Sequence, residues 1–175
     1  MKKLLFLAGL FFAVATASAQ APLEKGGFQL NAGVGLSGWG VPISLGLDYG
    51  IGNDLTVGGE LSYRSHTDKI DIFGGAKIEW NYTYIGILAN TNYHFNRVLN
   101  IPSQYDLYGG LALGYFIASV SNKDGLSYTG SNLSSFSAGL IVGGRYFFND
   151  VLAANLELSG ASATSSAKLG ITYKF

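Results

Sequence analysis

Apolar and polar side chains alternate with a period of two through most of this chain, and the alternation restricts the possible folds more than any other feature. Successive side chains of a β-strand point to opposite faces of a sheet, so a period of two is typical of strands. Eight segments follow the pattern, at residues 27–37, 43–51, 55–64, 85–95, 105–118, 135–148, 151–160 and 167–175. The pattern therefore predicts an all-β protein with eight strands.

Two further observations disfavour a helical fold. After residue 20 the chain has no apolar run of about 18 residues, the length that a membrane-spanning helix needs. The chain contains 25 glycines, and each glycine inside a helix costs about 1 kcal/mol. We therefore expect neither a helical membrane protein nor a helical soluble domain.

The distribution of charge distinguishes a membrane barrel from a soluble β-sandwich. The apolar face of the eight segments carries no Asp, Glu, Lys or Arg, and the other face is mostly Gly, Ser, Ala, Thr and Asn with a few charges. A soluble sandwich would expose its charged face to water, whereas small polar residues suit the narrow interior of a barrel that faces lipid outside. We therefore predict an eight-stranded antiparallel up-and-down transmembrane β-barrel.

Aromatic residues and connection lengths indicate how such a barrel is oriented. Tyrosines and phenylalanines cluster near the strand ends, as in the two aromatic girdles of outer-membrane barrels. Residues 52–54 and 149–150 form short turns, whereas 65–77 and 119–134 are long segments rich in polar residues. Short turns are expected on the periplasmic side and long loops outside the cell. Both termini are therefore expected in the periplasm.

The N-terminal 19 residues have the pattern of a secretory signal peptide, with Lys2 and Lys3, an apolar run and a small-residue cleavage site. The expected mature chain is the barrel domain, residues 20–175. It has no cysteine, and its nine Lys and Arg against eleven Asp and Glu give a net charge of −2. Because no basic tract is present, nucleic acid is not expected as a partner. The pattern indicates no cofactor and no metal site.

The last strand carries the most specific signal. In the sequence AKLGITYKF, residues 167–175, large apolar side chains share one face and a phenylalanine comes last; these residues are Leu169, Ile171, Tyr173 and Phe175. With its eight strands, the chain resembles the small eight-stranded outer-membrane proteins of Gram-negative bacteria, the OmpA/OmpX-like family, without the periplasmic domain of full-length OmpA. The resemblance implies an outer-membrane location and contact with outer-membrane lipid and lipopolysaccharide. It also implies insertion by periplasmic chaperones and the assembly machinery, which would read the last strand as a signal.

Charges on the inward face are expected to form an ion network. An eight-stranded barrel is about filled by its side chains, and a buried charge without a partner is costly. If the last two strands pair about residues 162–163, Glu157 lies opposite Lys168, and Arg145 can reach the same layer. We predict that the network plugs the barrel, with a proton or ion path as the alternative; its members are Asp48, Glu60, Arg64, Arg145, Glu157 and Lys168.

The segment KIEWNYTY, residues 77–84, is difficult to assign to a face. Trp80, Tyr82 and Tyr84 have the parity of the inward side chains that follow them. Either a β-bulge changes the register near residue 84, or the strand continues beyond the membrane. We predict that these three aromatic residues make external contacts.

Three functions are compatible with this pattern. The first is a surface-interaction protein without enzymatic activity, which acts through its external loops and has a plugged lumen. The second is a narrow conduit for small or hydrophobic molecules, as in OmpW-like barrels. The third is a lipid A-modifying enzyme, for which His66, Ser65 and Asp68 would supply a base, a nucleophile and a carboxylate. His94 is expected to form hydrogen bonds at the rim of the barrel.

Overall fold

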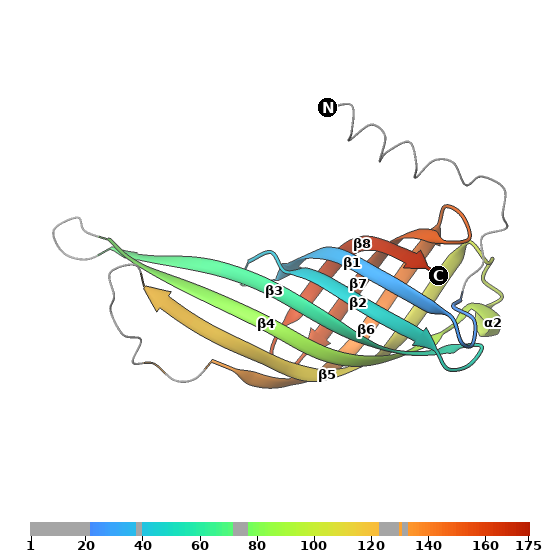
Figure 1. The fold of residues 1–175 in the computed structure, drawn as a ribbon, viewed down its shortest axis with the longest axis horizontal. Helices are drawn as coiled ribbons and strands as arrows, with labels where there is room; N and C mark the ends of the chain where they lie inside the picture. The colour runs from blue at the N-terminus through green and yellow to red at the C-terminus, as the bar shows by residue number, and fades with distance from the viewer. Residues whose placement is uncertain (1–21, 38–39, 72–76, 123–129, 131–132) are drawn as a thin grey trace, which may run out of the picture.

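Eight antiparallel strands form a closed barrel in chain order, which confirms the predicted fold class (Figure 1). The computed structural model describes residues 22–37, 40–71, 77–122, 130 and 133–175, so the expected signal peptide lies outside the described residues. The elements are β1 (Phe28–Ser37), β2 (Ile43–Gly50), β3 (Leu55–Asp71), β4 (Lys77–His94), α2 (Asn96–Leu99), β5 (Tyr105–Asn122), β6 (Ser135–Phe147), β7 (Leu152–Ala161) and β8 (Ser165–Lys174).

The barrel closes because the last strand pairs with the first. The ladder between β1 and β8 begins at Gln29 opposite Lys174 and ends at Ser37 opposite Ser166. Closure pairs the backbone of both strands on both sides, which removes the free edges that an open sheet would expose. The segment AKLGITYKF is therefore the closing strand of the barrel.

The two faces of the barrel follow the alternation of the sequence. Large apolar side chains point outward and are about half exposed, for example Ile87 at 52% and Leu111 at 54%. Polar and small side chains point inward, and several are almost completely buried, including Gln29 at 1% and Asp106 at 2%. The outer surface is the apolar one, as a barrel surrounded by lipid requires.

The two ends of the barrel differ. We call one the terminal end, because β1 begins and β8 finishes there, together with the connections β2–β3, β4–β5 and β6–β7. Outward aromatic rings form close pairs at this end; these are Phe28 with Tyr49, Tyr93 with Phe95, Tyr105 with Tyr146, Tyr146 with Phe148, and Tyr173 with Phe175. We call the opposite end the long-strand end.

Three strands extend well beyond the others at the long-strand end, on the left of Figure 1. The β3–β4 ladder runs without interruption from Leu55 opposite Tyr93 to Asp71 opposite Lys77. The sequence-based prediction of loops at 65–77 and 119–134 was therefore wrong for residues 65–71, 77 and 119–122, which belong to strands. The uninterrupted ladder also excludes the bulge considered near residue 84.

No helix among the described residues is long and apolar enough to cross a membrane.

Candidate functional site

Arg145 is the centre of the charge layer nearer the terminal end. Its Nη1 donates a hydrogen bond of 2.8 Å to Asp106, and its Nη2 lies 3.4 Å from Asp48. The side chain of Arg145 is 3% exposed and those of the two aspartates are 1% and 4% exposed. Removing any of these groups from water alone would be costly, so the three charges stabilise one another as a unit.

Asp48 accepts further hydrogen bonds from three amide side chains. Gln29 and Asn31 each donate at 2.9 Å, and Asn90 donates at 3.2 Å. The carboxylate lies against Gly58 on the neighbouring strand, where a Cβ atom would overlap it. A glycine at this position therefore leaves the space that the buried carboxylate occupies.

His94 joins the same layer from β4. It is completely buried, and its two ring nitrogens lie 2.7 Å from Asp106 and 3.1 Å from the hydroxyl of Thr56. The side chain forms hydrogen bonds as the sequence predicted, but in the interior rather than at the rim. Asp106 was missed in the predicted network, although the alternation placed it on the inward face.

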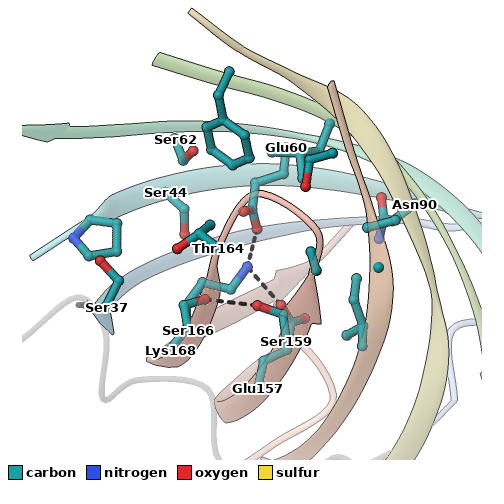
Figure 2. Close-up of a pocket in the computed structure, with 18 of the residues that line it drawn as sticks. Ser37, Ser44, Glu60, Ser62, Asn90, Glu157, Ser159, Thr164, Ser166 and Lys168 are labelled. Atoms are coloured by element: carbon teal, nitrogen blue, oxygen red, sulfur yellow. Dashed lines mark hydrogen bonds and ion pairs between the residues drawn. The ribbon is translucent and has the colours of Figure 1, made fainter. Parts of the chain in front are cut away.

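Lys168 is the centre of a second layer, one level towards the long-strand end (Figure 2). Its Nζ forms an ion pair of 2.7 Å with Glu157 and another with Glu60. Glu157 lies directly opposite Lys168 in the β7–β8 ladder, which is the pairing predicted from the sequence. In both layers one cation therefore lies between two carboxylates.

The two layers are joined by Tyr108, not by Arg145 as predicted. The Tyr108 hydroxyl donates a hydrogen bond of 3.0 Å to Glu157, and the guanidinium of Arg145 lies 4.1 Å from the centre of the Tyr108 ring. Arg145 lies opposite Asn155 in the β6–β7 ladder, whereas Glu157 lies opposite Gly143. This register places Arg145 two residues nearer the terminal end than the Glu157–Lys168 pair.

Close packing around Tyr108 predicts a position-specific effect of one methyl group. A Cβ atom at Gly143 would overlap the Tyr108 ring, whereas a Cβ atom at the adjacent Gly144 would have its nearest neighbour at 3.7 Å. We expect Gly143→Ala to lower the free energy of unfolding by about 1–3 kcal/mol, because overpacking displaces the ring. Gly144→Ala is the matched control and should change it far less. Urea titrations of both variants in lipid vesicles measure the difference, and equal effects would contradict this packing argument.

Two small cavities remain in the lumen. One, of about 80 Å³, lies above the Lys168 layer and is lined by the hydroxyls of Ser44, Ser62 and Ser159 among others (Figure 2). The other, of about 30 Å³, lies between the two charge layers. Cavities of these sizes hold a few water molecules.

Arg64 was predicted to belong to the ion network but lies apart from both layers. Its Nη1 donates hydrogen bonds to the hydroxyls of Ser37 and Thr164 at 3.3 and 3.2 Å. The guanidinium lies over the ring of Tyr84, 4.6 Å from its centre. Tyr84 is itself only 6% exposed, so the prediction that it makes external contacts was wrong.

The extended parts of three strands form a second candidate site, which we call the projecting sheet: residues 65–71 of β3, 77–83 of β4 and 119–122 of β5. Its outer face is polar, unlike the outer face of the barrel. The Thr67 hydroxyl donates a hydrogen bond of 2.7 Å to Asn81, and Lys69 forms an ion pair of 2.8 Å with Glu79. The last large apolar side chains on this face are at Tyr63, Ile85 and Ile117.

The inner face of the projecting sheet is rich in aromatic and aliphatic side chains. Trp80 lies between Asp68 and Asn122 in the strand ladders, and Tyr82 lies between His66 and Val120. Ile70 extends the same face towards the tip and is 53% exposed. The polarity of both faces therefore reverses beyond residues 64, 84 and 118, although the alternation of the strands continues.

The geometry of His66 does not support the catalytic alternative. Its Nε2 lies 2.8 Å from Asp68, so the histidine and the carboxylate do meet. Ser65 precedes His66 in a regular strand and therefore points to the opposite face of the sheet. The expected nucleophile cannot reach the base in this arrangement.

The residues expected to form the assembly signal lie on the outer face of the closing strand. All four are exposed: Leu169, Ile171, Tyr173 and Phe175.

Comparison with known proteins gives one family. A family model described as an outer membrane protein beta-barrel domain matches residues 5–175. Among curated protein sequences, none matches the chain significantly.

Solved structures with the same fold include three bacterial surface proteins. OprG of Pseudomonas aeruginosa has a TM-score of 0.63 at 14% identity, with 87% of this chain and 97% of that chain covered. Neisserial surface protein A has a TM-score of 0.54 at 20% identity, covering 85% and 96%. Ail of Yersinia pestis, crystallised with the heparin analogue sucrose octasulfate, has a TM-score of 0.51 at 18% identity, covering 85% and 97%. At these identities the likeness concerns the fold alone.

Proposed function

The chain belongs to the outer-membrane β-barrel family, and from this premise we propose that it is a non-enzymatic surface-interaction protein that contacts its partners through the projecting sheet. The long-strand end then lies outside the cell, and both termini lie in the periplasm. The asymmetry between short turns at the terminal end and long strands at the other supports this orientation. The outer face of the barrel contacts outer-membrane lipid and lipopolysaccharide, and the exposed side chains of β8 supply the signal for the assembly machinery.

The reversal of polarity in the projecting sheet is the observation that carries the proposal. A strand segment with polar side chains outside and aromatic side chains inside, such as Thr83 beside Tyr82, suits water rather than lipid on its outer face. The aromatic inner face, which includes Trp80, offers the residue types that are enriched in protein interfaces. The sheet therefore continues from the membrane into the medium outside the cell.

The projecting sheet also has an open edge along β3. The pairing of β2 with β3 ends at Tyr63, and no described strand pairs with β3 on that side beyond it. A Cβ atom at Gly40 would lie 2.9 Å from the carbonyl oxygen of Ser65, so this carbonyl points away from β4. Because the N–H and C=O of one residue share a side in an antiparallel strand, Thr67 and Lys69 present theirs to the open edge as well. An extended peptide can add to such an edge as a further strand.

Blocking this edge should reduce binding without unfolding the barrel. We expect Thr67→Pro to lower the affinity for a surface partner about tenfold or more, because the edge loses one N–H donor and the proline ring obstructs an added strand. Thr67→Ala keeps the N–H and is the matched control. The measurement is adhesion of cells that display the chain to immobilised heparin, fibronectin and laminin.

Folding of each variant is checked separately by its heat-modifiable mobility on gels. Equal adhesion by the two variants would contradict the proposal. So would adhesion of the unaltered chain that is no higher than that of cells without it.

The contents of the lumen support a closed barrel rather than a conduit. Arg145, Lys168 and their four carboxylates cross the interior at two levels, and Tyr108 fills the space between them. The cavities that remain, about 80 and 30 Å³, are the size of small water clusters.

A further inference from the structure

Arg64 differs from the other two cations of the lumen. Lys168 and Arg145 each lie between two carboxylates, whereas no carboxylate lies within ion-pair distance of Arg64 among the described residues. The residue is only 9% exposed, and its Nε is buried without a hydrogen-bond partner. Only Nη1 has acceptors among the described residues, and these are the neutral hydroxyls of Ser37 and Thr164.

The carboxylate nearest in sequence is already occupied. Glu60 lies four residues before Arg64 on β3, and its carboxylate forms an ion pair with Lys168. The rings of Tyr84 and Phe116, with centres 4.6 and 5.7 Å from the guanidinium carbon, offer only their negative faces. The guanidinium therefore retains donors and a positive charge that the described residues do not neutralise.

A vestibule of about 410 Å³ opens beside Arg64 at the long-strand end. Its walls combine the rings of Tyr84 and Phe116 and the side chain of Leu133 with the hydroxyls of Ser135 and Thr164. Arg64 also lines the smaller cavity above the Lys168 layer, so it separates the vestibule from the inner lumen. A molecule that enters the vestibule meets one cation at its base and apolar walls around it.

We propose that this vestibule binds the carboxylate of a small organic acid with a planar apolar body, held by Arg64. The fork of a guanidinium matches the two oxygens of a carboxylate, which can form two parallel hydrogen bonds to it. The aromatic walls then pack against the body of the acid. Because Arg64 is the one cation among the described residues that line the vestibule, a monoanion fits the site better than a phosphate or sulfate dianion.

Benzoate is the probe for this site. Isothermal titration of the unaltered chain in lipid nanodiscs, with empty nanodiscs as the blank, should give saturable binding of benzoate. Neutral benzamide has the same ring and nearly the same shape, and inorganic phosphate has charge without the ring. We expect both to bind about tenfold more weakly than benzoate, or not at all, because each lacks one half of the recognition. This comparison needs no variant.

Variants then assign the binding to Arg64. Arg64→Gln should lower the affinity for benzoate about tenfold or more, and Arg64→Lys should fall between it and the unaltered chain, because lysine keeps the charge but not the fork. Lys69→Gln, which removes a cation from the polar outer face of the projecting sheet, should leave the affinity unchanged. Equal binding of benzoate and benzamide, phosphate binding as tight as benzoate, or an unchanged affinity in Arg64→Gln would each overturn the proposal.

Discussion

Replacing Arg145 with methionine is expected to lower the free energy of unfolding by about 3–5 kcal/mol, because Asp48 and Asp106 would remain buried without their cation. These aspartate side chains are 4% and 1% exposed, so water cannot easily replace the guanidinium. Asp106 would retain only His94 as a partner of opposite potential charge. Urea titrations in lipid vesicles, with tryptophan fluorescence as the signal, measure the loss.

A compensated variant separates the cost of the orphaned carboxylates from the cost of lost packing. In Arg145→Met combined with Asp48→Asn and Asp106→Asn, no unpaired charge remains in this layer, so most of the stability should return. Lys69→Met removes one member of an exposed ion pair with Glu79 and should cost less than about 1 kcal/mol. A loss in Arg145→Met no larger than that in Lys69→Met would contradict the account of the buried layer.

The faces of the strands could be predicted from the sequence because one physical requirement governs every position of the barrel wall. A side chain such as Leu111 faces lipid, and its neighbour Ala112 faces a crowded interior, so any change of phase would place a polar group in lipid. The pairing of Glu157 with Lys168 was predictable for a similar reason. Only a short connection separates β7 from β8, and a short connection fixes the register.

The lengths of the projecting strands could not be predicted from the same rule. Beyond Tyr63 and Ile85 the outer face becomes polar and the inner face aromatic, so the pattern that identifies a lipid-facing strand is reversed. A hydrophobicity pattern cannot distinguish such a segment from a polar loop. The β3–β4 ladder nevertheless continues, supported by cross-strand pairs such as Lys69 with Glu79.

The layer of Arg145 was mispredicted because register across several strands accumulates small differences that the sequence does not display. Arg145 and Glu157 lie on neighbouring strands, but the β6–β7 ladder aligns Arg145 with Asn155. The isolation of Arg64 is similar, since no local pattern tells which inward cation lacks a carboxylate once the strands tilt. Charge composition predicted that the lumen would contain ion pairs, and only the register assigned the partners.

The reversal of polarity along β5 predicts a steep dependence of stability on the position of a new charge. Leu111 and Ser119 lie on the same strand and the same outer face, eight residues apart, which is roughly 26 Å along the strand. Leu111→Arg should lower the free energy of unfolding by about 2–4 kcal/mol, because the guanidinium enters the middle of the lipid belt. Ser119→Arg should cost about 0–1 kcal/mol, because its side chain lies in water above the belt.

The two arginine variants therefore locate the outer boundary of the membrane on this chain. Urea titration of both in the same vesicles gives the comparison, and the new side chain is identical, so helix or strand propensity and side-chain size cannot explain a difference. Equal costs at the two positions would mean that lipid reaches Ser119, and the projecting sheet would then be part of the membrane belt. A large cost at Leu111 alone would place the boundary between Ile117 and Ser119, where the last large apolar side chain of the outer face is followed by a hydroxyl.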